Sequence, residues 1–151
     1  MPTRVIVVGI LRGSRRGMSF HSQSYRKKIK ALLDKHVPGV EVYSPIEGDR
    51  DKHDYGLVRG IEAFFDMVRR ASQYDAIVTY VPEASMGSAI MMWEAFRNQR
   101  LVVTISPLKD NRTIKALSTA LCKDMKEFTS FVQKGQFSAL LAKSSADRAK
   151  S

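Results

Sequence analysis

Cysteine is nearly absent from this sequence, because Cys122 is the single cysteine among 151 residues. One cysteine cannot form an intramolecular disulfide, which excludes a disulfide-stabilised secreted scaffold and favours a reducing compartment. We interpret Cys122 as a small buried hydrophobic residue. A chain of this length buries roughly two-thirds of its unfolded surface, so it can fold without a disulfide or a metal.

Long hydrophobic runs are absent as well. The first apolar segment, Val5–Gly9, is far too short for a signal-peptide core or a membrane span. We therefore expect a cytoplasmic protein that does not associate with a membrane.

Acidic residues are scarce relative to basic ones, since 15 Asp and Glu stand against 25 Lys and Arg and the formal net charge is +10. Such a balance attracts anions, including nucleotides and nucleic acid. The basic residues are spread along the chain, so we interpret most of them as solvent-exposed helix faces. A basic nucleic-acid-binding domain is a third alternative, which the lack of an aromatic-interleaved basic motif disfavours.

Short apolar, β-branched segments predict strands that are buried on both faces of a sheet. The predicted strands are Val5–Gly9, Ala76–Val81 and Leu101–Ile105, with Val40–Tyr43 near an edge. Helical spacing of apolar residues predicts helices from Tyr25 to His36, Leu57 to Val68, Gly87 to Arg97, Thr113 to Leu121 and Lys123 to Val132.

This alternation of strands and helices predicts an α/β fold, with a parallel sheet of four or five strands and helices on both faces, of the flavodoxin or Rossmann-like kind. We expect a single nucleotide-binding domain over residues 1–143 and a disordered polar tail over residues 144–151. Apolar residues of the third helix, Trp93 above all, are expected in the core.

Two loops at the carboxyl ends of the predicted strands are suited to a ligand. Residues 9–17 hold three glycines and three arginines, which can approach and bind a phosphate, although an ordinary flexible basic loop fits equally well. Residues 82–88 open directly into a helix, where Ser85 is a natural N-cap and Gly87 leaves room for a ligand. Free N–H groups at such a helix start suit a phosphate, although ordinary capping explains the serine too.

The two loops together resemble the nucleoside 2-deoxyribosyltransferase superfamily. Gly9-x-x-Arg12-Gly13 after the first strand and Ser85-x-Gly87 at the third helix are most similar to the branch of 2'-deoxynucleoside 5'-phosphate N-hydrolases and related nucleotide N-glycosidases. The resemblance covers residues 4 to about 121. It implies a nucleoside 5'-monophosphate ligand, a homodimer, no cofactor and no metal.

The resemblance also implies roles for single residues. Those that would bind the substrate are Gly9, Arg12, Gly13, Ser85, Gly87, Ser88 and, from the neighbouring subunit, Ser118. Asp75 matches an aspartate common in the family, although a role in the turn before the third strand fits it equally well.

The catalytic position departs from the family. There a glutamate six residues after the serine cleaves the N-glycosidic bond, and here that residue is Met91, whose thioether can neither attack the sugar nor stabilise a cationic centre. Glu94, one turn further along the helix, and Glu83, before the serine, are alternative carboxylates, although a displacement of about 1 Å is already costly. Ile10 also replaces a small hydroxyl residue of the family.

Further candidates lie near these loops. The cluster Asp49, Asp51, His53 and Asp54 contains interleaved basic residues that argue against a metal, and closure over the base or sugar suits this loop better. His21 and Tyr25 could equally contact the ligand or pack.

The sequence thus predicts a nucleoside 5'-monophosphate N-glycosidase or (deoxy)ribosyltransferase-like protein. The alternative is a catalytically silent nucleotide-binding homologue with the same pocket.

Overall fold

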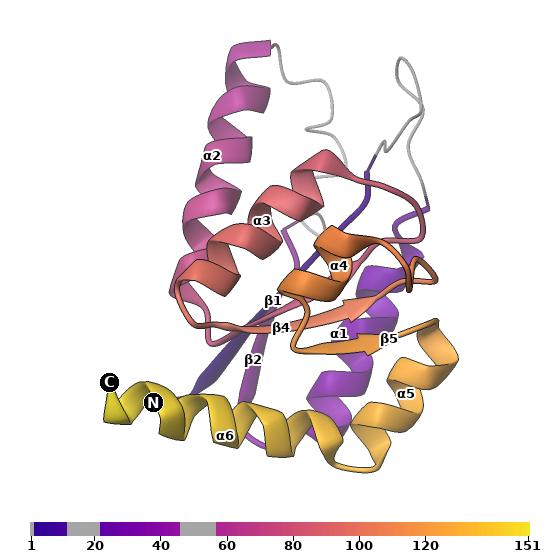
Figure 1. The fold of residues 1–151 in the computed structure, drawn as a ribbon, viewed down its shortest axis with the longest axis vertical. Coiled ribbons are helices and arrows are strands. Elements are labelled where there is room, and N and C mark those ends of the chain that lie inside the picture. Colours follow the sequence, from indigo (N-terminus) through magenta and orange to yellow (C-terminus); the bar gives the residue numbers. More distant parts are fainter. Residues whose placement is uncertain (1, 12–21, 46–56) are drawn as a thin grey trace.

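The computed structural model in Figure 1 describes residues 2–11, 22–45 and 57–151. Its centre is a parallel sheet in which five strands follow the order β2-β1-β3-β4-β5. The strand bounds are β1 Thr3–Gly9, β2 Val40–Tyr43, β3 Ala76–Tyr80, β4 Leu101–Ile105 and β5 Ala120–Cys122. The predicted α/β fold with a parallel sheet of four or five strands is confirmed.

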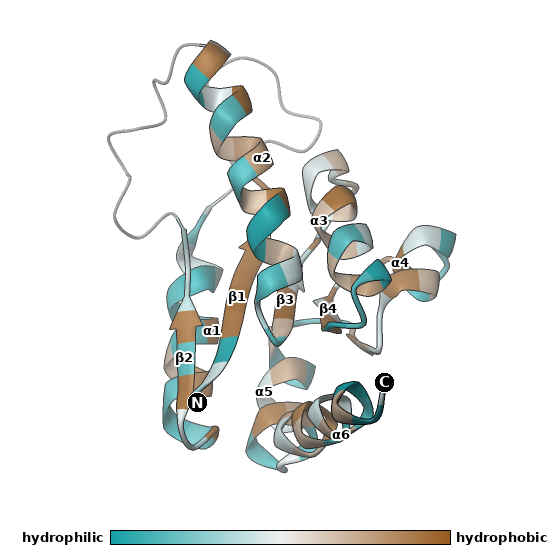
Figure 2. Cartoon of the chain, turned by 90° about the vertical axis from the view of Figure 1, so that its left-hand side faces the viewer, coloured by the Kyte–Doolittle hydropathy of each residue, from teal (hydrophilic) through white to brown (hydrophobic). Residues whose placement is uncertain are grey.

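Both faces of the sheet are apolar because alternate residues of each strand point to opposite sides. Val5 and Val7 of β1 belong to one core cluster, and Ile6 and Val8 belong to the other. In Figure 2 β1 is brown along most of its length, as expected for a strand covered on both sides. The predicted strands β1, β3 and β4 are confirmed.

Helices cover the two faces in groups. The first core cluster joins the sheet to α1 Ser24–His36, α5 Met125–Gln133 and α6 Gln136–Lys150. The second joins it to α2 Leu57–Gln73, α3 Met86–Arg97 and α4 Arg112–Leu117. In the described part of the chain, no helix combines the length and the apolar character that a membrane crossing requires.

The prediction of one helix from Thr113 to Leu121 is wrong in its second half. Helix α4 ends at Leu117, and Ala120–Cys122 forms the fifth strand, which pairs with Val103–Ile105 of β4. The short apolar run at Ala120 continues the helical spacing of α4, which hides the strand in the sequence. Cys122 is buried as predicted, and burial raises the pKa of its thiol to about 11, so that the thiol stays protonated at neutral pH.

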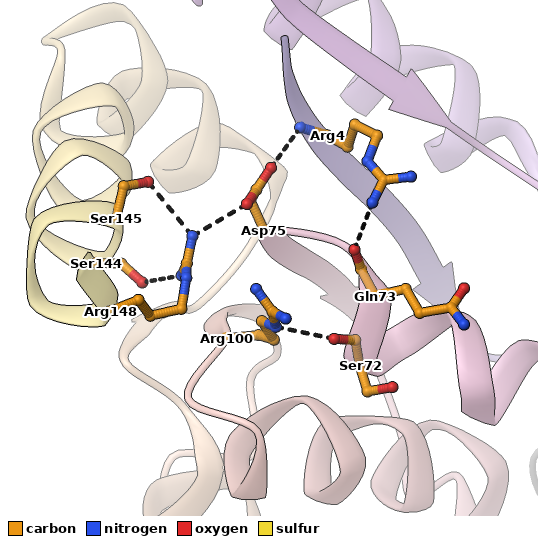
Figure 3. Close-up of polar contacts among 8 residues, drawn as sticks. All are labelled: Arg4, Ser72, Gln73, Asp75, Arg100, Ser144, Ser145 and Arg148. Atoms are coloured by element: carbon orange, nitrogen blue, oxygen red, sulfur yellow. Dashed lines mark hydrogen bonds and ion pairs between the residues drawn. The ribbon is translucent and has the colours of Figure 1, made fainter. Parts of the chain in front are cut away.

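The predicted disordered tail over residues 144–151 is also wrong, because residues 144–150 belong to α6. Phe137 and Leu141, one turn apart, are buried and anchor this helix to the core. Further along, Arg148 donates to the Asp75 carboxylate at 3.0 Å and to the Ser144 hydroxyl at 2.8 Å (Figure 3). Long-range packing thus orders a segment whose polar composition suggests fraying.

Candidate functional site

The strand order places a topological switch point between β1 and β3, which is where open parallel sheets bind ligands. Gly9 and Tyr80, the last residues of the two strands, are register partners at this edge. Several residues expected here lie outside the described residues: Arg12, Gly13, His21, Asp49, Asp51, His53 and Asp54.

Close packing against a neighbouring side chain requires glycine at position 9. A Cβ at this position would lie 2.5 Å from the Tyr25 hydroxyl oxygen and 2.8 Å from its ring carbon Cζ. Tyr25 cannot retreat, because its ring stacks on Tyr80 with centroids 4.3 Å apart and its hydroxyl donates to the Ile10 carbonyl at 3.2 Å. Burial raises the pKa of Tyr25 to about 12, so the phenol is a neutral donor. Within the described residues Tyr25 fills the space beside Gly9.

Gly9→Ala is therefore expected to destabilise the fold by about 1–3 kcal/mol, as overpacking of a filled core does. Chemical denaturation measures this change. In a double-mutant cycle with Tyr25→Ala, the cost of Gly9→Ala should fall, because the smaller residue vacates the space. An unchanged cost in the Tyr25→Ala background would show that the clash is not with this ring.

Ile10 is fully buried, so its side chain belongs to the core and not to a ligand surface.

The start of α3 is organised as predicted, with Ser85 as its N-cap. The Ser85 hydroxyl accepts from the Ser88 amide at 3.4 Å and donates to the Ser88 hydroxyl at 2.9 Å. Ser88 is buried, so its hydroxyl holds the cap in place. The amides of Met86 and Gly87 find no acceptor among the described residues, as is usual in a first helical turn. These two N–H groups and the helix dipole leave a partial positive charge at the carboxyl edge of the sheet.

Gly87 is a helical residue in which the fold does not require glycine. A Cβ there would meet the Phe64 ring of α2 at 3.9 Å, an ordinary contact distance.

A cavity of about 190 Å³ adjoins this helix start, between α3 and α4. Ser85, Met86, Ala89 and Met92 line it from the α3 side, and Asn111 and Ile114 line it from the α4 side. Most of its lining is apolar, with the Ser85 cap and Asn111 as polar edges. The cavity therefore lies next to the partial positive charge of the helix start.

Met91 lies on the other side of α3 from this cavity. It follows Gly87 by one helical turn, on the stripe that faces Phe64 and α2. Its half-buried side chain packs against the core cluster that contains Ile6 and Val8. Among the described residues, the surroundings of residue 91 are therefore apolar, which suits a methionine.

The two alternative carboxylates differ in their surroundings. Glu94 accepts from Arg97 Nε at 2.6 Å and Nη2 at 3.1 Å, and this hydrogen bonding lowers the pKa of Glu94. It also accepts from Asn98 at 3.2 Å, so it is directed toward the C-terminal end of α3 and away from Ser85. Glu83 precedes the helix and has interactions of its own.

Asp75 lies at the opposite end of the sheet, before the first residue of β3. Its carboxylate accepts from the Arg4 amide at 2.9 Å and from Arg148 at 3.0 Å (Figure 3). A ligand at the carboxyl ends of the strands cannot reach it, so the alternative of a turn residue is the one that the structure favours.

Ser118, the residue expected to serve a neighbouring subunit, is the C-cap of α4. Its hydroxyl lies 2.6 Å from the Thr104 hydroxyl of β4, close to the carboxyl edge of the sheet.

Several side chains differ from their sequence-based placement. Trp93, Met86 and Phe96, apolar residues predicted in the core, are 53%, 85% and 47% exposed, because the buried stripe of α3 runs through Ser88, Met92 and Ala95 instead. Arg26 is an exception to the interpretation of most basic residues as solvent-exposed, since it is only 3% exposed and donates to the Val7 carbonyl at 3.0 Å. Its position on the helical stripe of Ile29 and Leu33 was the signal that could have revealed this. This buried guanidinium adds positive charge beside β1.

The strand order and the helices on both faces define an α/β domain of the doubly wound class. No protein-family model matches the sequence, and neither does any of the curated proteins. Among solved structures, the chain is similar to a 2-deoxyribosyltransferase from Bacillus psychrosaccharolyticus, with a TM-score of 0.60, 16% identity, and coverage of 83% of this chain and 90% of the other. A flavoenzyme NAD(P)H:acceptor oxidoreductase from Paracoccus denitrificans overlaps with a TM-score of 0.34, 20% identity and coverage of 77% and 66%. The first likeness establishes a shared fold.

Proposed function

We propose that this chain binds a nucleoside 5'-monophosphate at the start of α3, as a cytoplasmic nucleotide-binding protein of the deoxyribosyltransferase type. The observation that carries the proposal is the Ser85-capped helix start, whose Met86 and Gly87 amides have no acceptor in the described residues. A helix start at the carboxyl edge of a parallel sheet supports phosphate binding, because its N–H groups and the helix dipole favour an anion. The fold shared with a 2-deoxyribosyltransferase supports the nucleoside part of the ligand.

The reaction class that this site fits is cleavage of the base–sugar bond, with water or a second base as acceptor. Arg12 and Gly13 would complete the phosphate site, and Ser118 of a second subunit would reach it in a homodimer. The reaction passes through a cationic sugar, which a carboxylate near C1' stabilises.

A second candidate, a nucleotide-binding protein without chemistry, is favoured by one specific observation. The family glutamate is replaced by Met91 in an apolar setting, and Glu94 is held by Arg97 and Asn98. Glu83 is the one carboxylate in residues 82–88, the described segment that leads into α3. The two candidates share the binding site and differ only in turnover.

The proposal predicts that a nucleoside monophosphate binds more tightly than its nucleoside, by roughly 1.5–3 kcal/mol for a charge-assisted hydrogen bond. Isothermal titration calorimetry with matched pairs measures this difference. Equal affinities of the monophosphate and the nucleoside would show that this site does not bind the phosphate.

Met86→Pro makes the same test specific to the helix start. Proline lacks the N–H group yet suits the first position of a helix, and Ser85 already has the extended backbone (φ −139°, ψ 112°) that a following proline requires. Helix α3 should therefore persist, while the advantage of the monophosphate over the nucleoside shrinks. Met86→Ala is the matched control, because it removes the same side chain and keeps the amide.

A further inference from the structure

The basic residues of the described helices are divided unevenly between the two sides of the sheet, although the sequence scatters them. Helices α1, α5 and α6, which cover one side, carry nine Lys and Arg against three Asp and Glu. Helices α2, α3 and α4, on the other side, carry six against three. Because α1 packs on α5 and α5 packs on α6, the first three helices form one continuous surface (Figure 1).

Six exposed lysines on this surface have no ion-pair partner among the described residues. They are Lys27, Lys28 and Lys35 of α1, Lys126 and Lys134 near the two ends of α5, and Lys143 of α6. We call these residues the lysine face. Two carboxylates of this side are engaged locally, since Asp34 pairs with Lys30 at 2.6 Å and Asp124 accepts from the Glu127 amide at 2.8 Å. The lysine face therefore presents free positive charge to solvent.

The lysines point away from the sheet because each helix buries its opposite stripe. On α1, Ile29 and Leu33 are buried, whereas Lys28 and Lys35 lie seven residues apart on the solvent side. Two helical turns separate this pair by about 10 Å along the axis. Each strand of a nucleic-acid duplex places a phosphate about every 3.4 Å along its axis, so a surface of this length meets several phosphates at once.

The composition of the lysine face indicates the class of its partner. Protein interfaces are depleted of lysine, and stable attachment to a membrane takes an apolar or lipid anchor in addition to basic residues. Within residues 2–11, 22–45 and 57–151, however, every large hydrophobic side chain that is exposed lies on α2 or α3. The phosphate backbone of a nucleic acid needs no apolar anchor, because charge alone supplies non-specific binding.

The same composition favours a duplex over a single strand. Single strands are held by bases that stack on exposed aromatic rings, whereas Phe128 of α5 and Phe137 of α6 are buried in the core. Base edges are commonly read by arginine, but Arg26, the arginine of α1, is buried and donates to the Val7 carbonyl. The ammonium groups that remain can neutralise phosphates and carry no means of reading a sequence.

We infer that the lysine face binds the phosphate backbone of a nucleic-acid duplex without sequence preference. Such binding needs no aromatic-interleaved motif, so the lack of that motif in the sequence does not oppose it. The start of α3 lies on the other side of the sheet. The surface is therefore separate from the proposed nucleotide site and does not depend on it.

Fluorescence anisotropy of a labelled DNA duplex of about 20 base pairs, without any nucleotide, measures this binding. A dissociation constant of about 10⁻⁴–10⁻⁶ M is expected at physiological salt, as for other non-specific binding. If about four of the six lysines contact phosphates, the logarithm of the association constant should fall with the logarithm of the salt concentration with a slope of about −4. The affinity should then drop about 10²-fold between about 50 mM and 200 mM salt. A second duplex of unrelated sequence should bind equally.

Combining Lys28→Gln, Lys35→Gln and Lys126→Gln locates the binding on the face. The triple variant should bind at least about tenfold more weakly at about 50 mM salt, and its salt slope should be shallower by about two to three. Circular dichroism should show an unchanged fold, because all three side chains are exposed.

The matched control combines Arg59→Gln, Arg112→Gln and Lys115→Gln. It removes the same charge from exposed positions on α2 and α4, on the other side of the sheet. Its salt slope should change by less than about one. An equal loss of binding in both triple variants would overturn the inference, since net charge alone would then explain the affinity.

RNA and single-stranded arms complete the test. Binding of a DNA or an RNA duplex supports the inference, and the tighter of the two identifies the kind of duplex. Absence of binding to both at about 50 mM salt overturns it. So does tighter binding to a single strand of the same length, and so does association with anionic phospholipid vesicles when neither duplex binds. None of these measurements contains nucleotide, so a failure here is distinct from a failure of the proposed function.

Discussion

Met91→Glu is expected to raise the release of free base from a nucleoside 5'-monophosphate at least about tenfold. A well-positioned acid–base group typically contributes about 10²–10⁴-fold to a rate, so a tenfold gain allows for imperfect placement of the new carboxylate. Residue 91 lies one turn beyond Gly87, and helical side chains lean toward the N-terminus of their helix. An introduced carboxylate would therefore lean toward a sugar whose phosphate is bound at Ser85 and Gly87. The unmodified protein is expected to bind the nucleotide and release base slowly or not at all.

The surroundings of Met91 add a pH dependence to this prediction. The side chain is half-buried against an apolar cluster, and burial raises the pKa of a carboxyl group. The group acts on the sugar in its ionised form, so the rate of the Met91→Glu variant should rise with pH until the carboxyl is ionised. Chromatographic release of base, measured over a pH series, tests both the gain and its direction.

The control for this experiment is Met91→Gln. Glutamine is similar to glutamate in size but carries no charge, so this variant should give no gain in base release. Rapid turnover by the unmodified protein, abolished by Glu94→Gln or Glu83→Gln, would show that another carboxylate performs the reaction. Absence of turnover in Met91→Glu with nucleotide binding retained would favour the binding protein without chemistry.

The sequence predicts the features of this fold that depend on local pattern. Continuous apolar runs are sufficient for β1, β3 and β4, since a strand that is buried on both faces needs nothing else. The Ser85 cap was also predictable, because serine before an apolar helix is a local signal. The alternation of strands and helices also predicts ligand loops at the carboxyl ends of the strands, whereas the strand order, and with it the switch point, comes from the structure.

The sequence does not reveal which face of an apolar helix is covered. Helix α3 is apolar on most sides, so its pattern alone cannot distinguish Met92, which is buried, from Trp93, which is exposed. Arg26 shows the converse, because a charge is buried where the Val7 carbonyl and Gln23 can accept its hydrogen bonds. In both cases long-range packing decides the placement of the side chain.

Strand β5 and helix α6 were missed for the same physical reason. A three-residue strand has too few residues to show alternation, and its identity comes from pairing with β4. Helix α6 begins after Gly135, whose left-handed φ of 76° turns the chain back after α5. The sequence around Phe137 is only weakly periodic, so its burial depends on the surfaces that α5 and the sheet offer.

Phe137→Ala is accordingly expected to destabilise the protein by about 3–5 kcal/mol, the usual cost of removing a buried aromatic ring. Phe137 is fully buried, and its ring meets those of Phe128 and Phe131 edge-on, with centroids 6.5 Å and 6.3 Å apart. Denaturant unfolding measures the loss, and Lys143→Ala, an exposed site on the same helix, should change stability by less than about 0.5 kcal/mol. A loss below about 1 kcal/mol for Phe137→Ala would mean that α6 is not part of the folded core. The expected loss, by contrast, would show that the C-terminal helix belongs to the folded core on the face of the sheet opposite α3.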